Sequence, residues 1–154
     1  MKTIDYRNGL VRFRIPTQWI EEYEDGGGST FYADDPDSPT LRLNVLTFQS
    51  PRPVDEITPS ELLSSRAEKI HQSIVQLDTG NAVIAYNQSS EEDGHALLIF
   101  YWELANAVPP AHGRLAIFSL TILESQQDDP DIIETIQMVD REVKASEFAT
   151  LLGI

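Results

Sequence analysis

The stretch ALLIFYWEL at residues 96–104 decides the fold of this chain. Side chains of an extended strand point alternately to its two faces. One face of this stretch presents Phe100 and Trp102. The other face presents Ile99 and Tyr101. Apolar side chains on both faces are typical of an interior strand that is covered on both sides. The sequence therefore predicts a sheet with a covering layer on each face.

Two flanking stretches predict the neighbouring strands. Residues 82–86 and 115–123 are rich in the apolar and β-branched residues that favour strands. Asp93-Gly94 lies between the first of these stretches and the central one, and this dipeptide is a strong signal for a tight hairpin. The three strands are therefore expected to form an antiparallel meander.

The N-terminal third of the chain predicts further strands that are joined by short turns. Residues 11–15 alternate apolar and basic side chains, which is the period of a half-buried strand. Residues 19–24 and 29–33 flank a turn at 25–28 that holds consecutive glycines, and residues 41–48 are again apolar and alternating. Connections this short join antiparallel strands, because parallel neighbours need longer crossovers.

A first helix is predicted after this group of strands. Thr58, Pro59 and Glu61 supply a hydroxyl N-cap, proline at the first helical position and an acid three residues after the cap. The apolar residues that follow recur every three or four positions, at Leu63, Ala67, Ile70, Ile74 and Leu77. This spacing predicts a helix over residues 59–77, ending before Gly80, with one apolar stripe packed on the sheet.

A second helix is predicted to begin at Asp129-Pro130 and to cover the other face of the sheet. Its apolar residues recur at helical spacing, at Ile132, Ile136, Val139 and Val143. The expected fold class is therefore α+β, with a mainly antiparallel β-sheet sandwiched between helices. The length suits a single domain over residues 1–154.

The composition disfavours several classes of partner. Lys and Arg number 11 against 25 Asp and Glu, and the resulting formal net charge of −14 repels phosphate backbones and anionic lipid headgroups. We therefore expect neither a nucleic-acid nor a membrane partner. The chain has no cysteine, and residues 1–10 lack the apolar segment of a signal peptide. A soluble protein of the cytoplasm is expected.

Three features follow one another in an order that resembles the PsbP-like superfamily. They are the phrase FRIPTQW at residues 13–19, the capped helix after a proline-containing break at residues 50–53, and a meander that leads into a C-terminal helix. The superfamily includes the photosystem PsbP proteins, the nuclear-import factor that binds Ran, DcrB-type lipoproteins and Eag-type chaperones. The resemblance implies an antiparallel sheet between helices and a role in binding or assembly, but it transfers no functional residue. The lipoprotein branch begins with a lipidated cysteine, which this chain lacks.

Binding to another protein is the first functional hypothesis. The aromatic residues of the first predicted hairpin would supply the surface, because Trp and Tyr anchor interfaces. They are Trp19, Tyr23, Phe31 and Tyr32. The partner would be basic, to match the negative charge, or would present a hydrophobic segment to an apolar patch. Self-association as a structural subunit stays open at this point, as does the oligomeric state.

A small hydrolase or a divalent-metal protein is the alternative hypothesis. His112 is predicted to lie in a loop, where it could act as an acid or a base. The acidic loops at residues 34–37, 91–93 and 128–129 could bind a hard cation. The spacings of an EF-hand, a phosphate-binding loop and a serine-nucleophile elbow are nevertheless missing. No cofactor is therefore predicted, and no catalytic residue is assigned.

Overall fold

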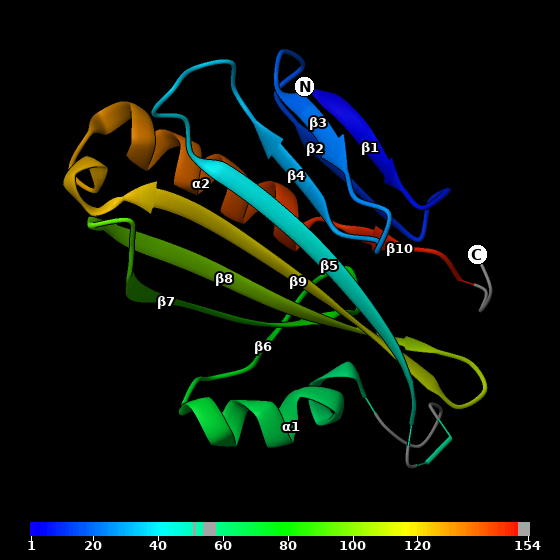
Figure 1. The fold of residues 1–154 in the computed structure, drawn as a ribbon. Coiled ribbons are helices and arrows are strands. Elements are labelled where there is room, and N and C mark those ends of the chain that lie inside the picture. The colour runs from blue at the N-terminus through cyan, green and yellow to red at the C-terminus, as the bar shows by residue number, and fades with distance from the viewer. Residues whose placement is uncertain (51, 54–57, 151–154) are drawn as a thin grey trace.

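The structure is a computed structural model that describes residues 1–50, 52–53 and 58–150, and Figure 1 shows how its elements are arranged. The larger sheet has the strand order β3 (Ile20–Tyr23), β4 (Ser29–Tyr32), β5 (Thr40–Gln49), β9 (His112–Leu123), β8 (His95–Val108), β7 (Ala82–Glu92) and β6 (Val75–Gln76). The smaller sheet has the order β1 (Lys2–Tyr6), β2 (Val11–Ile15) and β10 (Glu147–Phe148). The helices are α1 (Pro59–Ile70), α2 (Pro130–Lys144) and a short 3-10 helix, η1 (Glu124–Gln126).

Every strand pair in the described residues is antiparallel, so the predicted α+β class with a mainly antiparallel sheet is confirmed. The meander of β7, β8 and β9 is formed as predicted, and β5 pairs with β9 along its whole length. Asp93 and Gly94 close the β7–β8 hairpin with φ values of 52° and 79°. Positive φ at both positions is what the tightest hairpin turn requires.

The smaller sheet is a difference from the prediction, which had helices alone as the covering layers. β2 pairs with β1 and β10 and not with the larger sheet. Its side chains alternate as predicted, with Val11, Phe13 and Ile15 buried and Arg12 and Arg14 exposed. The buried face packs on the larger sheet, and α2 packs beside β2. One covering layer is therefore a sheet and a helix together, because a strand with one apolar face can cover a sheet as a helix does.

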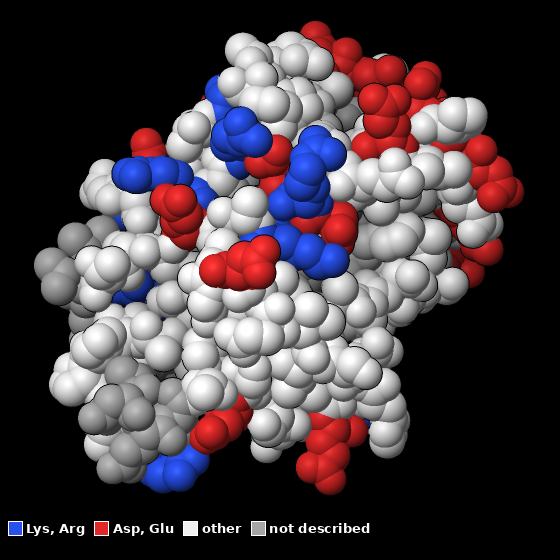
Figure 2. Space-filling model, turned by 180° about the vertical axis from the view of Figure 1, so that it is seen from behind, with Lys and Arg blue, Asp and Glu red and all other residues white. Residues whose placement is uncertain are grey.

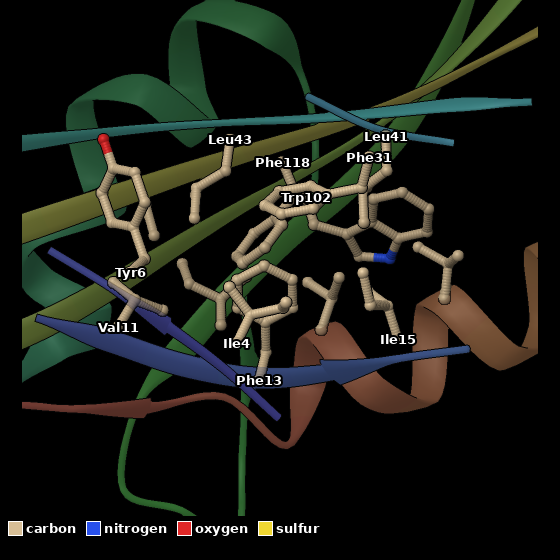
Figure 3. Packing of buried hydrophobic residues seen from close by; sticks show 14 of the residues in the cluster. Ile4, Tyr6, Val11, Phe13, Ile15, Phe31, Leu41, Leu43, Trp102 and Phe118 are labelled. Carbon is tan, nitrogen blue, oxygen red and sulfur yellow. The ribbon is translucent and has the colours of Figure 1, made fainter. Parts of the chain in front are cut away.

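Aromatic side chains fill the space between the two sheets. Figure 3 shows the side chains of the smaller sheet pointing toward those of the larger one. The ring of Phe13 meets the rings of Phe31 and Phe118 edge to face, with centroid distances of 5.4 and 5.1 Å. This geometry is favourable beyond the area that it buries. In the same cluster, the indole N–H of Trp102 donates a hydrogen bond of 2.9 Å to Asp140 of α2.

Helix α1 begins where the sequence predicts. The hydroxyl of Thr58 accepts a hydrogen bond of 3.4 Å from the backbone N–H of Glu61, and Pro59 occupies the first turn. The cap satisfies one of the donors that the start of a helix leaves free. In the preceding proline-containing break, Pro51 lies outside the described residues.

The predicted end of this helix is wrong. The helix ends at Ile70 and not at Leu77, and His71 caps it with a left-handed φ of 54°. The chain then turns back, so that Val75 lies opposite Val83 and β6 forms on the sheet. Apolar residues continue at helical spacing past the end of the helix. The backbone groups of Val75 and Gln76 nevertheless pair with β7 instead of forming helical hydrogen bonds.

The two helices lie against opposite faces of the larger sheet (Figure 1). On β8, Leu104 is buried in the cluster that contains Val143 of α2. The next residue, Ala105, is buried in the cluster that contains Leu63 of α1. Adjacent residues of a strand face opposite sides, so each helix covers its own face. The predicted start of α2, with an Asp129 cap, is confirmed as well.

We expect Phe118→Ala to lower the free energy of unfolding by about 3–5 kcal/mol, because it opens a cavity at the centre of the core. Phe118 is fully buried and touches Phe13. Leu46→Ala is the matched control, since Leu46 is 55% exposed on the same sheet and its truncation should cost less than about 0.5 kcal/mol. Urea unfolding of both variants measures the difference, and equal losses would contradict this description of the core.

Candidate partner-binding site

A buried carboxylate determines where α1 sits on the sheet. Glu103 lies in the middle of β8 and is 2% exposed. The guanidinium of Arg66 on α1 pairs with it, with Nε 3.0 Å from Oε1, and the hydroxyl of Tyr86 donates to Oε2 at 2.7 Å. A charge taken out of water must be paired and hydrogen-bonded. The helix is therefore anchored at the part of the face that holds Glu103.

Tyr86 connects this network to the exposed part of the sheet. Its hydroxyl accepts a hydrogen bond of 3.3 Å from Nη2 of Arg66, and its ring stacks on Tyr101 with a centroid distance of 5.1 Å. Burial, followed by the hydrogen bond to Glu103, raises the pKa of Tyr86 to about 12. The phenol is therefore neutral at ordinary pH and acts as a donor to the carboxylate.

Helix α1 covers only one end of its face of the sheet, and the remainder is a surface that we call the open face. The buried contacts of α1 are with Ile84 on β7 and Ala105 on β8. Farther along the same face, the side chains of β8 and β9 are half-buried, and Leu46 of β5, level with Ala105 but two strands away, is 55% exposed. The open face consists of Tyr32, Thr40, Arg42, Asn44, Leu46, Leu97, Ile99, Tyr101, Ile117, Ser119, Thr121 and Leu123.

The open face corrects the prediction that β8 is covered along both faces. Leu97, Ile99 and Tyr101 are only half-buried, although they belong to the apolar stretch that decided the fold. On the other face, Trp102 and Leu104 are buried, whereas Leu98 and Phe100, nearer the hairpin tip, are half-buried as well. Apolar residues on both faces predicted the sheet correctly, but a helix of this length covers only part of one face.

A shallow hollow of about 440 Å³ lies at the end of the open face that is farther from α1. Leu97, Ile99 and Thr121 form part of its wall. Arg42 lies there too, and its Nη1 is 3.5 Å from the hydroxyl of Thr121. Glu92 of β7 contributes a carboxylate to the lining. Most of the side chains that line this hollow are polar or charged, and Leu97 and Ile99 add apolar contact.

The structure separates the four aromatic residues that the sequence analysis placed on one partner surface. Trp19 is 6% exposed and Phe31 is fully buried, so both belong to the core. Tyr23 is 56% exposed, packs its ring edge to face on Phe31 and donates a hydrogen bond to Glu21 at 2.5 Å. Tyr32 lies opposite Thr40 of β5 and therefore joins the open face. A binding role stays a prediction for the two tyrosines.

His112 lies at the start of β9 and is half-buried, opposite Gln49 and Val108. The predicted loop position is thus a strand end. Within residues 1–50, 52–53 and 58–150, no three His, Cys, Asp or Glu side chains gather in a way that could hold a metal ion. The acidic loops and His112 are not brought together there, and the hypothesis of a hydrolytic or metal site stays a prediction.

Sequence reasoning missed Glu103 and its partner Arg66. A usable signal was present, because Glu103 is the acidic residue within the apolar run of β8, and buried acids need a cation. The identity of the cation could not be read, since 37 positions separate the two residues. A second such pair joins the buried Glu142 of α2 to Arg14 of β2, with N···O distances of 2.8 and 3.0 Å.

Charged side chains are unevenly distributed over the surface. Figure 2 shows acidic side chains gathered along one side of the molecule and a mixed group of both signs near the centre of the view. Below that group, a broad area carries few charges. Among the helices that the structure describes, none is long and apolar enough to cross a membrane.

Comparisons with known proteins show likeness in fold alone. No family model and no curated protein matches the chain. A protein of known structure from Bacteroides thetaiotaomicron superimposes with a TM-score of 0.64 at 14% identity, over 96% of this chain and 48% of that one. This chain therefore spans about half of that relative's length. LpqN, which is involved in cell envelope biogenesis of Mycobacterium tuberculosis, superimposes with a TM-score of 0.64 at 12% identity, over 90% of this chain and 83% of that one.

We expect Arg66→Met to lower the free energy of unfolding by about 3 kcal/mol, because it leaves the Glu103 carboxylate buried without its cation. Replacing both residues, Arg66→Met with Glu103→Leu, should recover most of the loss. Arg52→Met is the control, since it breaks the exposed pair of Arg52 and Glu61 and should cost less than about 1 kcal/mol. Urea unfolding measures all three, and a double variant as unstable as the single one would contradict the assignment.

Tyr86 should make stability depend on pH in alkaline solution. The folded pKa of about 12 lies above the ordinary value for tyrosine of about 10. The unfolded chain therefore loses this proton first, so the contribution is complete below pH 10 and is lost as pH rises to 12. We expect a shallower decline of stability over this range in Tyr86→Phe, measured by urea unfolding at each pH. Parallel curves for the two proteins would rule out this role.

Proposed function

We propose that this protein is an accessory module that binds another protein, in the manner of a chaperone, through the open face of its larger sheet. The observation that supports the proposal is apolar surface at both ends of this face. Leu97 and Ile99 of β8 are half-buried at one end, and at the other end half-buried Ile117 of β9 lies near the 55% exposed Leu46 of β5. Apolar surface left in contact with water marks interaction sites in many proteins. A partner that buries these side chains would be stabilised by the hydrophobic effect, because α1 does not cover them.

The chemistry of the open face favours an apolar segment as the occupant. Leu97, Ile99 and Ile117 offer apolar contact, while the hydroxyls of Ser119 and Thr121 can hydrogen-bond to the backbone of a bound segment. Polar groups spaced among apolar ones give a binding site its orientation. A hydrophobic segment of another protein, which the sequence analysis named as one possible partner, fits this surface.

The fold family and the compartment belong to the proposal as well. We assign the chain to a PsbP-like α/β/α sandwich, because a helix packs on each face of an antiparallel sheet and the elements follow the order of that superfamily. The cytoplasm remains the proposed location. LpqN is involved in cell envelope biogenesis, and fractionation of the host's cells, followed by detection of the native protein, separates the two locations.

Photo-crosslinking tests the binding surface directly. A photoreactive amino acid placed at Leu46 or at Thr121, both on the open face, should form adducts with the same protein in host cells. The control position is Ile133 on α2, which is 38% exposed and lies on the opposite side of the sheet. Adducts at the control position that match those at the open face would contradict the proposal.

The captured protein then permits a quantitative measurement. We expect Leu46→Lys to weaken its binding at least tenfold, because a charge enters the apolar contact. The free energy of unfolding should change by less than about 0.5 kcal/mol, because Leu46 is exposed in the free protein. Unchanged affinity of this variant would show that the partner binds elsewhere.

A further inference from the structure

Strand β7 exposes a long backbone edge. β6 pairs only with Val83 and Ala82, and β7 continues to Glu92 with β8 on one side alone. The carbonyl of Asn81 points outward, because it accepts a hydrogen bond of 2.9 Å from the N–H of Leu77. Peptide groups alternate between the two sides of a strand. The outward N–H and C=O groups beyond β6 therefore belong to Ala85, Asn87, Ser89 and Glu91.

These backbone groups are available for pairing. Within the part of the chain that the structure describes, none of them has a hydrogen-bond partner. Proteins usually protect such an edge with lysine, proline, a bulge or a covering element. β7 has neither lysine nor proline, and its pairing with β8 runs without a bulge from Ala82 to Glu92. The edge is thus suited to accept another strand.

An apolar hollow adjoins the same edge. It has a volume of about 340 Å³ and lies on the α2 side of the sheet. Its walls come from Ala85, Phe100, Trp102, Ile136 and Asp140. On the other side of the sheet, the stacked rings of Tyr86 and Tyr101 flank the edge. Every second side chain of an added strand would therefore face the hollow, and this alternation supplies specificity in strand addition.

The charge at the hairpin end of the edge favours a basic occupant. Nearer the helices, the cations Arg66 and Lys144 are paired with Glu103 and Asp140. Residues 70–113, which include all of β6, β7 and β8, contain no Lys or Arg. The hairpin tip next to the edge carries Glu91, Glu92 and Asp93. In Figure 2 the area below the mixed group of charges shows few charged side chains of either sign. A basic segment is attracted to this region, whereas a second copy with a net charge of −14 is repelled.

We propose that the outer edge of β7 binds an extended basic segment of another protein as an additional strand, with an apolar side chain in the adjoining hollow. The backbone pairing would involve Ala85, Asn87 and Ser89. The lysines or arginines of the segment would lie near Glu91 and Glu92. This site is separate from the open face, so it goes beyond the proposed function. Each of the two proposals can be tested without the other.

Synthetic peptides test the proposal. The probe is a fluorescent nine-residue peptide of alternating lysine and valine, and the matched control has glutamate in place of lysine. In fluorescence anisotropy at low salt, the lysine peptide should bind saturably and at least tenfold more tightly than the glutamate peptide. In the complex, hydrogen exchange of the amides of Ala85, Asn87 and Ser89 should slow at least tenfold, because each N–H becomes a donor to the peptide.

Variants separate backbone pairing from general charge attraction. Asn87→Pro removes one outward donor and keeps the side that pairs with β8, so it should weaken binding at least tenfold. Glu92→Lys should weaken binding several-fold, whereas Asp25→Lys, which changes the net charge equally in a distant turn, should have a smaller effect. Glu92→Lys keeps the test informative if the proline variant does not fold. Leu46→Lys should bind the peptide as the unaltered protein does, which distinguishes this edge from the open face.

Three results would overturn the proposal. The first is the absence of saturable binding of the lysine peptide. The second is protection that falls on another sheet edge, such as β3 or residues 45–49 of β5, or on the open face, and not on β7. The third is protection of the β7 amides by raised protein concentration without peptide, which would show that a second copy occupies the edge.

Discussion

The pairing of the Glu103 carboxylate with Arg66 is the constraint on which the covering of the larger sheet depends. A carboxylate that is 2% exposed in the middle of an apolar strand needs a cation and a second donor at that point. Arg66 supplies the cation from α1, and Tyr86 supplies the donor from the neighbouring strand. The helix must therefore lie over this end of the sheet. The rest of the same face is left to solvent or to a partner.

The two proposed binding surfaces both follow from this placement. Because α1 does not extend over Leu97 and Ile99, these side chains stay half-buried and form the open face. Because the helix ends at Ile70, the chain returns to the sheet only as the two-residue strand β6, and most of β7 keeps a free edge. One surface offers apolar side chains and the other offers backbone groups with nearby carboxylates. They are suited to partners of different chemistry.

Particular residues show how far sequence reasoning reaches. Thr58 and the Asp93-Gly94 turn were predicted correctly, because a cap or a tight turn depends on a few adjacent residues. The helix end at Ile70 was not predicted, because it depends on β7, a strand that comes later in the chain. The aromatic residues of the first hairpin differ in burial for a similar reason. Trp19 and Phe31 are buried by the smaller sheet and its neighbours, whereas Tyr32 faces the other side, and the sequence alone does not reveal which side is covered.

The sequence by itself determined the α+β class, the longer antiparallel strands and the starts of both helices, since these depend on local hydrogen bonding and on side-chain periodicity. Tertiary structure decided that β2 pairs with β1 and β10, two strands that the sequence did not predict, and not with the larger sheet. It also decided that Arg66 meets Glu103, and which parts of the sheet stay uncovered. The physical reason is that burial and ion pairing depend on contacts between residues far apart in the chain. Such contacts carry no periodic signal, so both candidate surfaces became visible only in the folded protein.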